Sequence, residues 1–133
     1  MRVTWAATAP ESGRYSAVEK DSDIGLLEDH FVALRLQGQG YLEVRLPGGE
    51  FPWLSVGFHG DRAVIHLFDH PERSSLLVGD GTAMADAVVY IPVMDELVAF
   101  SGGFVLTVDR AWVLVRSFLR SGAPGELGEW CEL

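Results

Sequence analysis

A chain of 133 residues is long enough to enclose one hydrophobic core, and we therefore expect a single domain that covers residues 1–133. Because 48% of the residues are apolar and aromatic residues are spread along the chain, the composition excludes wholesale disorder. Nineteen acidic residues against ten basic ones give a formal charge of −9, which argues against direct binding to nucleic acid or to an anionic membrane.

Targeting signals and cysteine content indicate the cellular compartment. The first ten residues lack the basic start and the apolar run of a secretory signal. No stretch approaches the roughly 18 uninterrupted apolar residues of a membrane span. Cys131 is the only cysteine, so no internal disulfide can form. These features predict a cytoplasmic protein.

The N-terminal part of the sequence predicts a strand, a loop and a helix. Residues 2–5 are expected to form a short strand, and residues 10–14 are typical of a loop. Residues 22–30 then predict a short helix, in which Ser22 or Asp23 is the N-cap and apolar residues follow at helical spacing.

From Leu34 onward, apolar residues recur at every second position, which predicts antiparallel strands. The first two strands cover residues 34–37 and 41–46, and Gly38-Gln39-Gly40 joins them as a hairpin turn. Further strands, separated by Gly- and Pro-containing turns, are expected at residues 53–58, 62–68, 75–78, 86–91 and 104–108.

The clearest helix covers residues 110–121, with Asp109 as its N-cap, Gly122 at its end and Pro124 just beyond. Its apolar residues gather on one face, which predicts that the helix packs on the sheet. The fold class is therefore α+β, an antiparallel β-sheet meander with an N-terminal helix and a C-terminal amphipathic helix packed on it.

Three histidines, His59, His66 and His70, are the only concentration of possible metal ligands, and they give the alternative hypothesis of a small metal-assisted enzyme. However, His59 lies in a turn, His70 precedes Pro71, and their spacing matches no compact metal motif. The sequence also has no P-loop and no nucleophile elbow. We therefore expect no catalytic residue, no metal and no cofactor.

Acidic residues concentrate in a segment where Lys20 is the only cation, and the members of this group are Glu19, Asp21, Asp23, Glu28 and Asp29. One interpretation is a docking patch for a basic protein partner. The other is a set of charges near a helix N-terminus, where they interact favourably with the helix dipole. The sequence supports both interpretations.

The C-terminal segment is rich in turns and ends in a large side chain, Trp130, which we expect to fold back on the sheet. A strand through Val108, the amphipathic helix, Gly122, Pro124 and the pair Glu129-Trp130 together resemble the Imm1 family of bacterial immunity proteins. The resemblance extends more loosely to the central strands.

The resemblance implies an α+β protein that binds a toxin and neutralises it by complex formation. Such toxins often carry deaminase-superfamily domains that act on nucleic acid or nucleotides. The family brings no catalytic residue, and we favour a structural role for its motif, Gly122, Pro124, Glu129 and Trp130. A generic protein-interaction domain without a toxin partner is the remaining hypothesis.

Charge agrees with the resemblance, because a toxin that acts on nucleic acid needs a basic substrate groove that an acidic protein can cover. Tight inhibitors rely on a few aromatic or arginine anchors. The aromatic residues expected to be exposed and to serve as anchors are Trp5, Tyr15, Tyr41 and Trp53.

Overall fold

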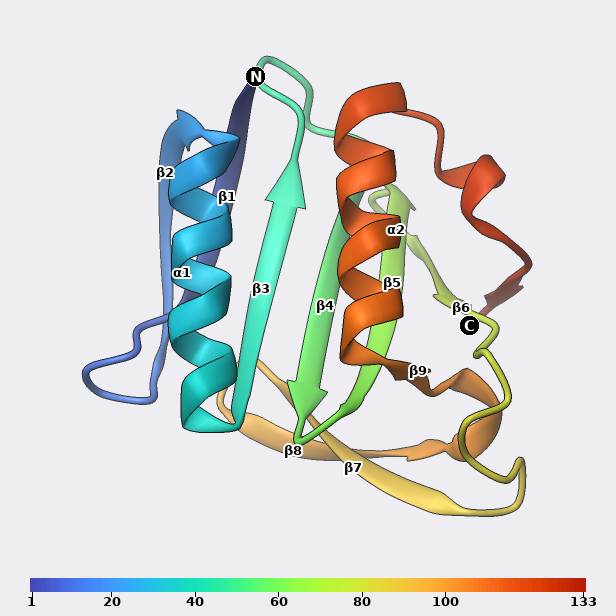
Figure 1. Cartoon of the computed structure of the whole chain (residues 1–133). Helices are drawn as coiled ribbons and strands as arrows, with labels where there is room; N and C mark the ends of the chain where they lie inside the picture. The colour runs from blue at the N-terminus through green and yellow to red at the C-terminus, as the bar shows by residue number, and fades with distance from the viewer.

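The computed structural model describes residues 1–133 and contains ten strands and two α-helices (Figure 1). In chain order, these elements are β1 (Arg2–Thr8), β2 (Tyr15–Asp23), α1 (Ile24–Gln37), β3 (Gln39–Arg45), β4 (Trp53–His59), β5 (Arg62–His70), β6 (Arg73–Leu77), β7 (Val88–Val93), β8 (Glu96–Ser101), β9 (Leu106–Thr107), α2 (Val108–Ser121) and β10 (Trp130–Glu132). No helix is long and apolar enough to cross a membrane.

The main sheet is antiparallel, with the strand order β10-β6-β5-β4-β3-β1-β2, and the short β9 pairs with β5. Strands β3 to β6 form a meander, whereas β1 lies between β2 and β3. Helix α1 connects β2 to β3 and crosses over β1 on the way. The predicted α+β class, with an antiparallel sheet and helices packed on it, is confirmed.

Both helices cover the same side of the main sheet, which we call its inner face (Figure 1). Alternate residues of the strands point to this side and form the larger core with the apolar residues of the helices. Phe58 and Phe118 are its largest fully buried side chains, and Phe31 of α1 stacks on Trp112 of α2. The two helices therefore contact each other as well as the sheet.

The opposite side of the sheet, its outer face, carries the separate two-stranded hairpin β7–β8. Val89 and Ile91 of the hairpin pack on Val64 and Leu76 of the main sheet in a second apolar cluster. The hairpin approaches β4 so closely that a Cβ atom at Gly57 would lie 2.2 Å from the main-chain oxygen of Pro92. Glycine at this position is therefore what allows the hairpin to lie on the sheet.

Helix α1 is longer than predicted, and the hairpin turn expected at residues 38–40 is wrong. Residues 34–37 continue the helix, with Leu34 buried on the side that also carries Leu27 and Phe31. Leu36 points into solvent and is 85% exposed, so the apparent two-residue period of Leu34 and Leu36 did not reflect a strand. Gly38 ends the helix in the left-handed conformation, with a φ of 92°.

The sequence does not predict β2 and β8, because most residues of these strands are exposed and no alternation results. The strand expected at residues 104–108 is also largely wrong. Only Leu106–Thr107 pairs as β9, because a 3-10 turn occupies Gly102–Phe104 and α2 already begins at Val108. The N-cap of α2 is consequently Thr107 and not Asp109.

Candidate protein-binding surface

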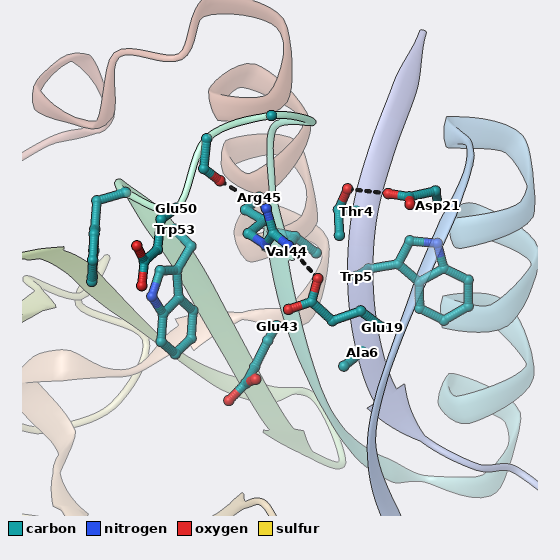
Figure 2. A pocket seen from close by; sticks show the side chains of 13 residues that line it. Thr4, Trp5, Ala6, Glu19, Asp21, Glu43, Val44, Arg45, Glu50 and Trp53 are labelled. Carbon is teal, nitrogen blue, oxygen red and sulfur yellow. Dashed lines mark hydrogen bonds and ion pairs between the residues drawn. The ribbon is translucent and has the colours of Figure 1, made fainter. Parts of the chain in front are cut away.

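A groove of about 710 Å³ opens on the outer face of the sheet, over β2, β1, β3 and the start of β4 (Figure 2). Four carboxylates line it, those of Glu19, Asp21, Glu43 and Glu50, and Arg45 is the one cation among the lining residues. The formal charge of this lining is therefore −3. We call this feature the acidic groove.

Strand alternation explains why these charges lie together. Glu19 and Asp21 of β2 point to the outer face, as do Glu43 and Arg45 of β3, since the intervening residues point to the inner face. The connection between β3 and β4 adds Glu50. Three segments that are separate in sequence thus place their carboxylates on one surface.

Arg45 organises the middle of the acidic groove. Its guanidinium forms an ion pair with Glu19 and donates a hydrogen bond of 2.8 Å to the main-chain oxygen of Gly49 (Figure 2). At the edge strand, the Asp21 carboxylate accepts a hydrogen bond from the Thr4 hydroxyl. Glu50 is exposed and forms no ion pair, so its charge is free to meet a partner.

Glu43 accepts hydrogen bonds from two tyrosines, at 2.6 Å from the Tyr15 hydroxyl and 2.7 Å from the Tyr41 hydroxyl. Burial, reinforced by the Glu43 carboxylate, raises the pKa of both hydroxyls far above their usual range. Both tyrosines therefore stay protonated and act as donors at any physiological pH. The cluster fastens the edge strand β2 across β1 to β3.

An aromatic wall adjoins the carboxylates of the acidic groove. The Trp53 ring stacks on Phe68 with a centroid distance of 3.9 Å and an interplanar angle of 11°. Trp53 is half-buried and lines the groove beside Glu50 (Figure 2). A tryptophan next to carboxylates is a favourable environment for a guanidinium or an ammonium group.

The structure divides the acidic segment predicted from sequence. Only Glu19 and Asp21 line the acidic groove. Asp23 caps α1 and binds the N-terminal ammonium at 3.0 Å, which holds the pKa of its carboxyl below the usual range. Glu28 pairs with Arg116 of α2 at 3.2 Å, and Asp29 is exposed on α1 and does not line the acidic groove.

The structural interpretation of this acidic segment is confirmed for Asp23 alone, and docking through Glu19 and Asp21 stays a prediction. Asp23, at the helix N-terminus, has the structural role, and the first turn of α1 contains no acidic residue. Sequence reasoning missed Glu43, Arg45 and Glu50 as groove residues. The available signal was the shared parity of residues 43 and 45.

The aromatic residues expected as exposed anchors are only partly available. Trp5 and Tyr41 are buried, at 4% and 2% exposure, so the expectation is wrong for these two residues. Trp5 lies on the inner face, where its indole N–H donates to the Ser22 hydroxyl at 2.9 Å. Tyr15 and Trp53 are half-buried on the outer face and remain candidates.

The C-terminal motif holds the end of the chain against the sheet. Gly122 ends α2 with a φ of 66°, and the Pro124 main-chain oxygen accepts a hydrogen bond of 2.9 Å from the Trp130 indole. Trp130 packs on the larger core and belongs to β10, which pairs with β6, as expected from the sequence. The Glu129 side chain is exposed, while its main-chain oxygen accepts from the N–H of Val78 at 2.9 Å.

The three histidines of the metal hypothesis do not meet. His59 pairs with Arg62 at one end of the β4–β5 hairpin, and His70 lies at the other end of β5, roughly 25 Å away at about 3.3 Å per residue. His66 lies between them, against Phe68 and Phe100. No group of three His, Cys, Asp or Glu residues is placed to hold a metal ion. The alternative hypothesis, which needs these three histidines to lie together, is therefore wrong.

Burial lowers the pKa of His66 to about 4, so this side chain is neutral at physiological pH. It packs between the main sheet and the β7–β8 hairpin, and neither charge nor metal binding is needed to explain its place.

No protein-family model matches the chain, and no curated protein matches it either. The surface chemistry of the chain therefore carries the functional argument.

Proposed function

We propose that the chain is a cytoplasmic immunity protein of the Imm1 type, which binds a cognate bacterial toxin and neutralises it by covering its active site. The toxin that fits best belongs to the deaminase superfamily and acts on nucleic acid or nucleotides. In this proposal the protein acts by binding alone, without a catalytic residue, a metal or a cofactor.

The acidic groove is the observation that carries this proposal. A toxin that acts on nucleic acid uses lysine and arginine side chains to hold phosphates. The same cations form ion pairs with carboxylates, so a surface that presents Asp21 and Glu50 competes with the substrate for them. The formal charge of −9 also accelerates the encounter with a basic partner.

Trp53 provides an aromatic contact for a cation that binds in the acidic groove. A guanidinium that enters beside Glu50 contacts the exposed part of the indole face, an arrangement that stabilises Arg in protein interfaces. Tryptophan is also enriched among the residues that dominate binding energy. The groove thus combines charge with an aromatic anchor, as a specific interface requires.

Coexpression with the toxin encoded by the adjacent gene tests the proposed function. We expect cells that produce this toxin to survive when they also produce the protein, and the two proteins to co-purify at physiological salt. A toxin that kills equally with and without the protein, and that does not co-elute with it, contradicts the proposal. Co-purification with an adjacent gene product that is harmless to the cell would favour a generic interaction domain instead.

A further inference from the structure

The β7–β8 hairpin carries apolar residues on both of its sides, although one side is buried and the other is exposed to solvent. The side that faces the main sheet, with Val89 and Ile91, is buried. The side that faces away from the main sheet exposes Val88, Tyr90 and Leu97 to solvent, at 62%, 58% and 59% exposure. Tyr90 is paired with Ala99, which is also exposed, so the apolar residues of both strands continue across this side. We call this surface the hairpin patch.

An antiparallel sheet with one solvated side normally alternates apolar and polar residues. The hairpin patch departs from this pattern, because four outward positions on two paired strands are apolar or aromatic: Val88, Tyr90, Leu97 and Ala99. No other element of the chain covers these side chains. A contiguous apolar surface of this kind is typical of a site where another protein binds.

The charges around the hairpin patch indicate which kind of protein it binds. Residues 74–108 contain no Lys, Arg or His, and their four acidic residues are Asp80, Asp86, Asp95 and Glu96. If two copies of this chain bound each other through the hairpin patch, their acidic residues would lie close together, and residues 74–108 have no basic side chain to neutralise them. A basic partner is therefore favoured over self-association.

The hairpin patch lies on the same side of the sheet as the acidic groove. The hairpin crosses the sheet at Gly57, which pairs with Tyr41 of β3, and Glu43 of the groove lies two residues further along β3 on that face. The Asp95 carboxylate at the hairpin turn also accepts a hydrogen bond of 2.8 Å from the N–H of Tyr15 on β2. One partner can thus reach both features at once.

We propose that the hairpin patch is the apolar half of the interface. It binds an apolar segment, flanked by Lys or Arg, of the same basic toxin whose cations enter the acidic groove. This inference rests on the proposed function and adds a second contact to it. In this arrangement the groove supplies fast, salt-sensitive association, and the hairpin patch supplies apolar burial that slows dissociation.

Paired substitutions in the full chain test this inference, with the purified toxin domain of the adjacent gene as the probe. The hairpin variant carries Tyr90→Thr and Leu97→Thr, which retain β propensity. The control carries Leu26→Gln and Leu36→Gln on the solvent side of α1, where these leucines are 61% and 85% exposed. We expect the hairpin variant to bind the toxin at least about tenfold more weakly, mainly through faster dissociation, and the control to stay within about twofold.

The outcomes separate this inference from the proposed function. If the wild-type protein binds the toxin and the hairpin variant binds it equally well, the inference is overturned and the proposed function stands. Failure of the wild-type protein to bind overturns both. Sedimentation of the protein alone adds a further check, because a dimer that the hairpin substitutions convert to a monomer would assign the patch to a second copy and contradict the inference. Matching thermal unfolding of both variants confirms that folding is intact.

Discussion

Glu43 shows at the scale of single residues how the acidic groove is held together. Each oxygen of its carboxylate accepts a hydrogen bond, one from the Tyr15 hydroxyl and one from the Tyr41 hydroxyl, so it fixes the position of β2 and is less available to a partner than Glu50. Arg45 likewise holds Glu19 in place. The groove therefore has carboxylates that build its walls and carboxylates that are free to bind.

His66 gives a prediction for the pH dependence of stability. Its pKa is about 4 in the folded protein, against an ordinary value of 6.5, because burial disfavours the charged form. The unfolded chain therefore takes up a proton first as the pH falls. Above pH 6.5, His66 is neutral in both states and does not lower the free energy of unfolding. As the pH falls from 6.5 to about 4, the free energy of unfolding decreases by up to about 3 kcal/mol.

Chemical denaturation of the wild-type protein and of His66→Phe, repeated at intervals between pH 7.5 and about 4, measures this effect. As the pH falls, we expect the free energy of unfolding of the wild-type protein to decrease relative to that of the variant. Only the wild-type chain has a histidine at this position, which is protonated when the chain unfolds. Parallel stability curves for the two proteins would show that His66 titrates normally and would contradict its assigned surroundings.

At the scale of elements, the contact between β4 and the β7–β8 hairpin depends on Gly57. A methyl group at this position would collide with the main-chain oxygen of Pro92 at 2.2 Å, and the colliding atom belongs to a strand backbone that cannot rotate away. We expect Gly57→Ala to lift the hairpin and to destabilise the fold by about 1–3 kcal/mol. Thermal unfolding measures the loss, and hydrogen exchange locates it.

Gly60→Ala is a useful comparison, because Gly60 has a φ of 61° but a Cβ atom added to it would have no other atom within 4 Å. Its cost reflects backbone conformation alone. We expect faster exchange across β7 and β8 in Gly57→Ala but not in Gly60→Ala. Equal protection of the hairpin in both variants would mean that its contact with β4 is not tight.

The elements also show how far sequence reasoning reaches. Strands β4 and β5 and the amphipathic helix α2 were predicted within a few residues. Gly- and Pro-containing turns mark the limits of the two strands, and the apolar residues of α2 recur at helical spacing. Strand β2 was missed, because an edge strand with polar side chains on both sides has no period. Helix α1 was cut short for the converse reason, since its exposed Leu26, Val32 and Leu36 blur its amphipathic pattern.

The candidate site was predicted only in part, for a related reason. The acidic groove combines residues from β2, β3 and the β3–β4 connection, and their proximity depends on the pairing of β1 between β2 and β3. Local sequence carries no information about this strand order. An acidic run in sequence is therefore a poor guide, and it grouped Glu19 with Glu28, whose carboxylate binds Arg116 of the opposite helix.

At the scale of the whole molecule, charge is distributed unevenly between the two sides of the sheet. Four of the ten basic residues lie on the two helices that cover the inner face: Arg35, Arg110, Arg116 and Arg120. The outer side presents the acidic groove and the cation-free hairpin region. This asymmetry orients the protein with its outer side toward a basic partner.

The affinity of charge-neutralised variants for the purified toxin domain tests this account most directly. The groove variant carries Asp21→Asn and Glu50→Gln. The control carries Asp29→Asn on α1 and Glu132→Gln on β10, the edge opposite β2, so both proteins lose the same charge. We expect the groove variant to bind at least about tenfold more weakly, about 1.4 kcal/mol, with a smaller salt dependence, while the control stays within about twofold. Equal affinity of the two variants would contradict the assignment of the acidic groove as the toxin-binding surface.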